Sequence, residues 1–143
     1  MFEGTKAIDT PRHSFVNFDE ARKWAKENIV GSFLNHHTGE VITVSKTAID
    51  KYMSASSVLK SVDKDVHMSA LTKLPRLIET SILVETKQDR SNNKDIKAIQ
   101  RFYGAIDYEN KIYAVKITVK AYPAGLNKAY SYEVIKIETP IIT

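Results

Sequence analysis

The stretch from Lys97 to Tyr122 constrains the fold more than any other part of the chain. It contains two long runs of alternating apolar and polar residues joined at Glu109-Asn110, a pattern typical of an antiparallel hairpin. If Tyr108 pairs with Lys111, one face is almost wholly apolar, because side chains alternate along a strand. That face would carry Phe102, Gly104, Ile106, Tyr113, Val115, Ile117 and Val119. We therefore expect it to build the core.

The opposite face of the predicted hairpin is basic and aromatic. It would carry Arg101, Tyr103, Lys116, Thr118 and Lys120. If Tyr122 pairs with Tyr130 in a further strand, Tyr132 and Lys136 join this face. Cations between aromatic rings suit the phosphates and unstacked bases of nucleic acids. A solvated face of an antiparallel sheet carries the same residue types, so a purely structural role stays open.

Capping residues predict helices ahead of this hairpin. Asn17 and Ser45 can each cap a helix, and Asp65 can cap a third that ends before Pro75. Strands are expected at 33–34, 41–44, 81–86 and 130–138. This order predicts an α+β fold, with N-terminal helices packed on one face of an antiparallel sheet of about four strands.

Length and composition suggest one domain. The chain has 143 residues, of which 43% are hydrophobic, enough for a single core. We expect an extended leader over residues 1–15 and one α+β domain over residues 16–143. The net charge is +4, a mild bias that matters only if the basic residues cluster. The chain has no cysteine, signal-peptide pattern or long apolar run, which favours a cytoplasmic protein without disulfides.

If the basic face were catalytic, it could support metal-independent cleavage of RNA, which would make the chain a ribonuclease. His67 is the best titrating candidate, and its partner could be Glu85, Glu133 or Tyr132. The cation that stabilises the charged phosphorane could be Arg101, Lys116 or Lys51. The alternative is that His67 is a buried histidine with a structural role. The adjacent His36 and His37 are interpreted as part of a solvated turn, so no metal site and no cofactor is expected.

From Thr38 to Thr139 the chain resembles domains of the large polyvalent proteins of phages and conjugative elements. The resemblance rests on TGEVITVSKTAIDKYMS, HMSALTKLPRLIETSILVE, RFYGAIDYENKIYAVKITVKAY and AYSYEVIKIE. It implies a barnase-like fold, related to the barnase/EndoU/colicin/RelE nucleases. Nuclease members of this class commonly place a basic residue or histidine at the end of a helix where Lys51 stands here.

Two functions follow as hypotheses. The first is a mobile-element domain that binds, and could cleave, RNA or DNA through the basic sheet face. The second is a non-catalytic module that docks onto or regulates a neighbouring domain of a longer polypeptide. An exposed apolar patch at Ile99, Ile112 or Val134 would favour the second hypothesis.

Overall fold

The computed structural model describes residues 7–88, 98–122 and 127–136, and only the backbone at 131, 133, 135 and 136. Within these ranges the chain forms β1 Ile8–Asp9, α1 Phe18–Asn28, β2 Gly31–Leu34, β3 Val41–Val44, α2 Lys46–Tyr52, α3 Ala55–Lys60, α4 Lys64–Leu71, α5 Leu74–Thr80, β4 Ile82–Gln88, β5 Ala98–Tyr108, β6 Lys111–Ala121 and β7 Asn127–Lys136. The predicted α+β class is confirmed. Of the helices described, none is long and apolar enough to cross a membrane.

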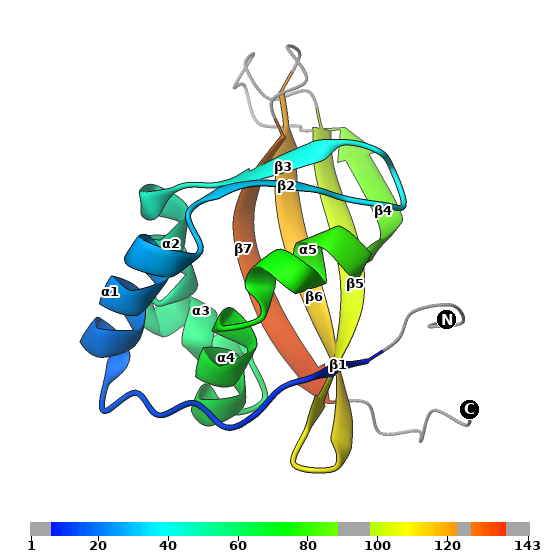
Figure 1. Ribbon diagram of the computed structural model, residues 1–143. Coiled ribbons are helices and arrows are strands. Elements are labelled where there is room, and N and C mark those ends of the chain that lie inside the picture. The colour runs from blue at the N-terminus through cyan, green and yellow to red at the C-terminus, as the bar shows by residue number, and fades with distance from the viewer. Residues whose placement is uncertain (1–6, 89–97, 123–126, 137–143) are drawn as a thin grey trace.

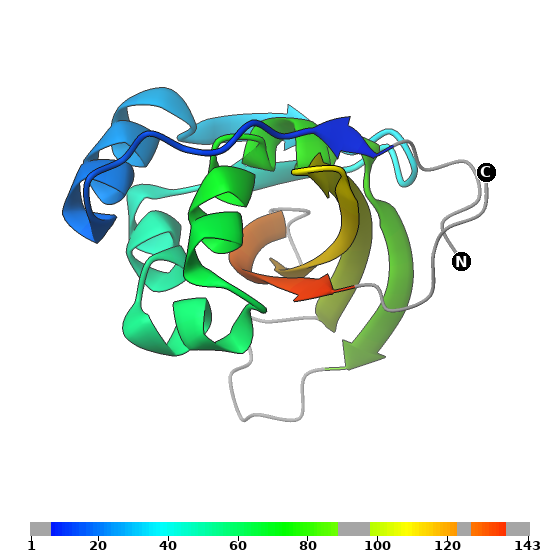
Figure 2. The same cartoon turned by 90° about the horizontal axis from the view of Figure 1, so that it is seen from below.

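The strands form one curled, mixed sheet of seven strands in the described part of the chain (Figures 1 and 2). Their order is β1-β5-β6-β7-β3-β2. β4 lies off this path: it pairs with the edge of β5 that also pairs with β1, but with different residues of β5. The predicted sheet of about four antiparallel strands is wrong in number and in direction. β1 pairs with β5, and β3 with β7, in parallel. These pairings join segments distant in sequence, which local alternation cannot reveal.

The central hairpin forms in the predicted register. Tyr108 pairs with Lys111, and Glu109 and Asn110 adopt positive φ angles of 50° and 62°. Positive φ at both turn residues gives the tight turn whose twist matches two antiparallel strands. The predicted apolar face is buried throughout, including Phe102 and Ile117 at 1% exposure each.

The predicted helix caps are partly confirmed. The side chain of Asn17 accepts a hydrogen bond from the backbone N–H of Glu20, and Ser45 caps α2 in the same way. Asp65, however, is not a cap. Asp63 begins α4 two residues earlier, because its carboxylate accepts from the N–H groups of Asp65 and Val66.

The helices cover one face and one side of the sheet. α5 lies across β5 and β6, while α1 to α4 gather beside β7 (Figure 1). A Cβ atom on Gly104 of β5 would lie only 3.0 Å from Leu77 Cδ2, so glycine lets α5 approach the strand closely. The core therefore lies between α5, the other helices and the apolar face of the hairpin.

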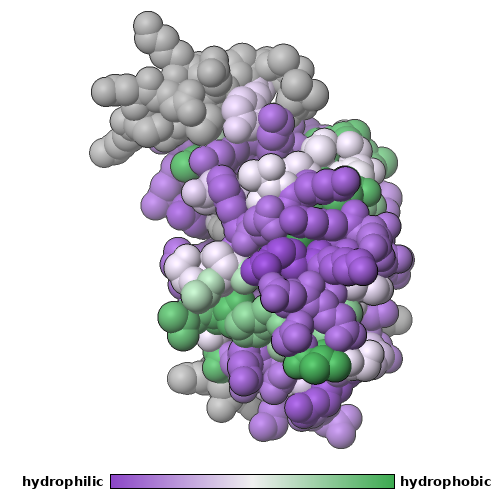
Figure 3. Space-filling view, turned by 90° about the vertical axis from the view of Figure 1, so that its left-hand side faces the viewer, coloured by the Kyte–Doolittle hydropathy of each residue, from purple (hydrophilic) through white to green (hydrophobic). Residues whose placement is uncertain are grey.

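The outward surface of the helices is mainly polar. Seen from the side of α1 to α4, hydrophilic residues dominate and the apolar patches are small and separate (Figure 3). Leu59 of α3 is the most exposed large apolar side chain on these helices, at 83%. Exposed apolar residues that stand singly are common on soluble proteins and do not mark a site by themselves.

Candidate functional site

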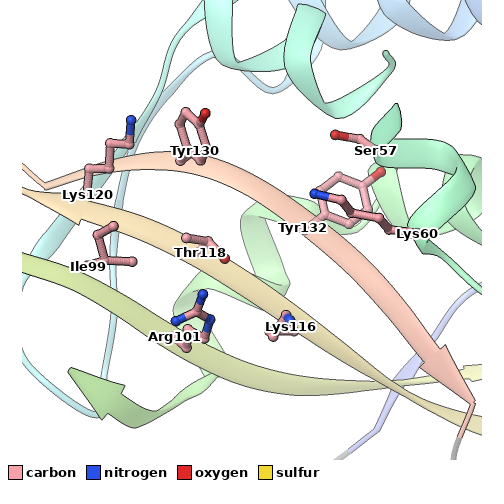
Figure 4. A pocket seen from close by; sticks show the side chains of 9 residues that line it. All are labelled: Ser57, Lys60, Ile99, Arg101, Lys116, Thr118, Lys120, Tyr130 and Tyr132. Atoms are coloured by element: carbon pink, nitrogen blue, oxygen red, sulfur yellow. The ribbon is translucent and has the colours of Figure 1, made fainter. Parts of the chain in front are cut away.

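A hollow of about 230 Å³ opens where α3 faces the sheet (Figure 4). Side chains from α3, β5, β6 and β7 line it: Ser57, Lys60, Ile99, Arg101, Lys116, Thr118, Lys120, Tyr130 and Tyr132. Four of these nine residues are basic, and none of these lining residues is acidic. We call this region the basic hollow. It contains much of the basic face predicted from the hairpin.

Strand register explains why these cations share one face. Ile99 pairs with Lys120, Arg101 with Thr118, and Tyr103 with Lys116. Directly paired residues of antiparallel strands project to the same side of the sheet. The predicted grouping of Arg101, Lys116 and Lys120 is therefore confirmed, although Tyr103 shares their face without lining the hollow.

A β-bulge in β7 overturns the predicted position of Tyr132. Val119 pairs with Ala129 while Thr118 pairs with Ser131, so Tyr130 is an extra residue between two registers. Beyond the bulge, Tyr132 pairs with Ile117 and faces the core, where it is only 2% exposed. The prediction that Tyr132 belongs to the solvent-facing basic surface is wrong.

Lys136 was also expected on the basic surface, but its backbone position in β7 belongs to the opposite face of the sheet. Its backbone is registered against Tyr113, a residue of the core face, while its side chain is outside the described part of the structure. The cause is again the β-bulge. The predicted register pairs Lys120 with Tyr132, four residues from its observed partner Lys128, and a shift by an even number of residues keeps every side chain on its face.

An acidic residue moderates the charge of the hollow at one edge. Glu85 of β4 lies 3.7 Å from the Arg101 guanidinium and 3.1 Å from Lys87 Nζ. Exposed ion pairs of this kind contribute little to stability, and a polyanion can compete for the same cations.

At the other end of the hollow, two lysines contact one aromatic ring. Lys120 Nζ lies 3.8 Å from the ring centroid of Tyr130, and Lys51 Nζ lies 4.2 Å from it. Lys51 is in the last turn of α2, so the ring joins a helix to the sheet. The structure therefore brings Lys51 close to the basic face.

His67 lies inside the protein, away from the hollow's solvent. It is fully buried, and its Nε2 donates to the carbonyl oxygen of Tyr52 at 2.8 Å. Its Nδ1 then accepts from the hydroxyl of Ser61 at 2.6 Å. Burial lowers the pKa of His67 from 6.5 to about 4, although the bond to Tyr52 acts in the opposite direction. A neutral, doubly hydrogen-bonded imidazole has the features of a structural residue.

Tyr132 is equally enclosed. Its ring stacks on His67 with the centroids 4.4 Å apart, and its hydroxyl donates to the His67 carbonyl oxygen. Burial raises the pKa of Tyr132 well above its usual value, and the nearby Tyr52 raises it further. The two titrating candidates thus lie together with their polar atoms in buried hydrogen bonds, and Tyr132 borders the hollow while only 2% exposed.

The adjacent histidines behave as interpreted from the sequence. His36 and His37 are exposed in the turn between β2 and β3, where His37 Nδ1 accepts from the backbone N–H of Leu83. Across the described residues, no group of three or more potential ligands is placed to hold a metal ion.

Three residues of the hollow were missed by sequence reasoning. Ser57 and Lys60 lie in α3, a helix that is not among those predicted from the sequence, and Ser54 caps it through the N–H of Ser57. That serine is the signal that could have placed them. Tyr130 was passed over, although its predicted pairing with Tyr122 already places it on the basic face of the sheet.

The family model of large polyvalent protein-associated domain 3 matches residues 17–130. The match includes every residue that lines the basic hollow except Tyr132. No curated protein and no solved structure matches the chain. The expected likeness to barnase-type nucleases therefore stays a prediction.

Proposed function

Because the chain belongs to the large polyvalent protein-associated domain 3 family, we propose that it is a nucleic-acid-binding module of a longer polypeptide. The basic hollow contacts the phosphate backbone of a single strand of RNA or DNA. The observation that carries this proposal is that one hollow is lined by four cations, Lys60, Arg101, Lys116 and Lys120, and by the aromatic ring of Tyr130. Positively charged grooves with aromatic side chains are the usual means of binding single strands.

The size of the hollow supports a single strand as the ligand. About 230 Å³ bounded by four structural elements can take a small part of one flexible chain, whereas a duplex is far larger than such an opening. The cations lie around the opening on both the α3 side and the sheet side (Figure 4). A flexible strand can bend to place successive phosphates near them.

Binding without cleavage agrees best with the placement of the titrating groups. General acid–base catalysis requires a group that reaches the transferred proton. His67 and Tyr132 use their polar atoms in buried hydrogen bonds, whereas Lys51 and Arg101 supply positive charge that suits a phosphate. We assign no catalytic role to these four residues.

The test is binding of a fluorescent 12-nucleotide single strand, as RNA and as DNA, across a range of salt concentrations. Each phosphate contact adds about 0.7 to the negative slope of log affinity against log salt. The variant Lys116→Glu with Lys120→Glu should bind more weakly and show a shallower slope. Lys23→Glu, an exposed position on α1, is the matched control. Equal, salt-insensitive binding by both variants would contradict the proposal.

Intact RNA after incubation in excess chelator would support binding alone. Cleavage that is abolished by His67→Ala or Lys51→Ala, in variants that remain folded, would instead establish a ribonuclease. A thermal melt of each variant separates loss of activity from loss of structure.

A docking function is a second candidate, and the hairpin of β2 and β3 favours it. Leu34 and Val41 pair across this hairpin and are 46% and 48% exposed. The apolar patch expected at Ile99, Ile112 or Val134 is not there, since Val134 is fully buried and the other two are half-buried. Amide hydrogen exchange at β2 would be slower in the longer polypeptide than in this chain if a neighbouring domain covers the hairpin.

A further inference from the structure

Tyr130 holds two positive charges at a position created by the β-bulge. Lys51 Nζ from α2 and Lys120 Nζ from β6 both lie near its ring, at 4.2 Å and 3.8 Å from the centroid. The three residues come from three different elements, so the arrangement depends on tertiary structure. Lys51 is exposed, and Lys120 and Tyr130 are half-buried, which leaves the group open to a ligand.

The spacing of the two ammonium groups suits one phosphate. The two nitrogens are within about 8 Å of each other, since their separation cannot exceed the sum of their distances to the same centroid. A phosphate oxygen accepts from an ammonium group at about 2.8 Å, and two oxygens of one phosphodiester are about 2.5 Å apart. One phosphodiester can therefore bridge the two lysines.

Electrostatics favours an anion at this point. Two like charges held near one ring repel each other, and an anion between them replaces repulsion with attraction. Contact between an exposed ammonium group and an aromatic face is weak, so both lysines can turn from the ring towards a phosphate. Lys120 Nζ and the Tyr130 hydroxyl both point away from the sheet in Figure 4, so the hydroxyl can add a third donor.

We propose that Lys51, Lys120 and Tyr130 form a clamp for one phosphodiester of a single-stranded nucleic acid, at the end of the basic hollow. This inference rests on the proposed function, because the same strand occupies both. The clamp holds one backbone phosphate, and the adjoining nucleotide extends over the hollow towards Arg101 and Lys116. Single-stranded backbone, and not a free base or a duplex, is the chemistry that the clamp recognises.

The experiment compares Lys51→Gln, Lys120→Gln and the double variant in binding to the same fluorescent 12-nucleotide strand at several salt concentrations. If both lysines hold one phosphate, each single change should weaken binding about tenfold. The double change should reduce the salt slope by only about 0.7 in all, the contribution of one phosphate. Tyr130→Leu should weaken binding as well, whereas Tyr130→Phe tests the hydroxyl alone. Lys23→Gln is the control for loss of one surface charge.

The outcomes separate the clamp from the function on which it rests. Non-additive losses at Lys51 and Lys120, with unchanged thermal melting, support the clamp. Additive losses with a slope change of about 1.4 would place the two lysines on different phosphates. That result would overturn the clamp but leave the proposed nucleic-acid binding in place. No loss in Lys51→Gln would overturn it in the same way. Absence of binding by the unchanged protein would overturn both proposals.

Discussion

The hydroxyl of Tyr132 donates a hydrogen bond of 2.9 Å to the backbone carbonyl oxygen of His67, and the rings of the two residues stack. Ser61 adds a second connection, because its hydroxyl oxygen both contacts His67 Nδ1 and accepts from the N–H of Val134. These contacts join α4 and the segment before it to β7. The histidine that looked most like a catalytic base from the sequence therefore stabilises the fold.

Replacing His67 should destabilise the protein strongly. His67→Ala leaves a cavity and removes the partner of the Ser61 hydroxyl, for an expected loss of about 2–4 kcal/mol in the free energy of unfolding. Urea denaturation measures the loss. His36→Ala, at an exposed histidine, should change the stability by less than about 0.5 kcal/mol. Equal stability of the two variants would contradict a structural role for His67.

Stability should fall as the pH is lowered from about 6.5 to about 4. Above pH 6.5, His67 is neutral in both the folded and the unfolded chain and contributes no pH dependence. Between the two pKa values the unfolded chain binds a proton that the folded protein excludes, which costs about 1.4 kcal/mol per pH unit and about 3 kcal/mol in all. Urea denaturation from about pH 7.5 to about 4.5 measures this slope. His67→Gln should flatten the dependence of the free energy of unfolding on pH. An unchanged slope in this variant would show that other titrating groups cause the pH dependence.

Gly104→Ala should reduce stability by about 1–3 kcal/mol. The added methyl group would lie 3.0 Å from Leu77 Cδ2, and Leu77 is a fully buried residue of α5 with little room to move. Shortening the opposing side chain should relieve the clash, so Gly104→Ala should cost less in a Leu77→Val background. A double-mutant cycle measures this coupling. Additive effects would show that the two residues do not compete for space.

Glu109→Asn should stabilise the central hairpin by about 0.5–1 kcal/mol. Glu109 has a φ angle of 50°, which asparagine adopts more readily than glutamate. The change also removes a 3.6 Å contact with Arg12, but both side chains are more than half exposed and the pair contributes little. Thermal denaturation of Glu109→Asn and Glu109→Gln separates the two effects, because only the former relieves the backbone.

Glu85→Gln should strengthen nucleic-acid binding and steepen its salt dependence. Removing this carboxylate releases Arg101 and Lys87 from a competing anion at the edge of the basic hollow. We expect a gain of about two- to fivefold at low salt, measured with the same fluorescent strand. Glu27→Gln, an exposed position on α1, makes the same change in net charge away from the hollow. A gain of equal size there would assign the effect to overall charge.

Local sequence patterns were sufficient for the hairpin and for the N-terminal caps of α1 and α2. Tyr108 pairs with Lys111 as predicted, because strict alternation and a two-residue turn leave one register that buries the apolar side chains. Asn17 and Ser45 cap their helices because a cap bonds to N–H groups two or three residues away. The same reasoning favoured Asp65 over Asp63, two acidic residues that the pattern alone does not separate.

The sequence by itself determined the α+β class, the core face of the hairpin and the basic character of its opposite face, because these depend on residues close together in the chain. Only the tertiary structure decided where Tyr132 and Lys51 lie. One extra residue in β7 turns Tyr132 towards the core, and the approach of α2 places Lys51 against Tyr130. Register between distant strands and contact between helix and sheet are set by packing of the whole core, and no local pattern carries that information.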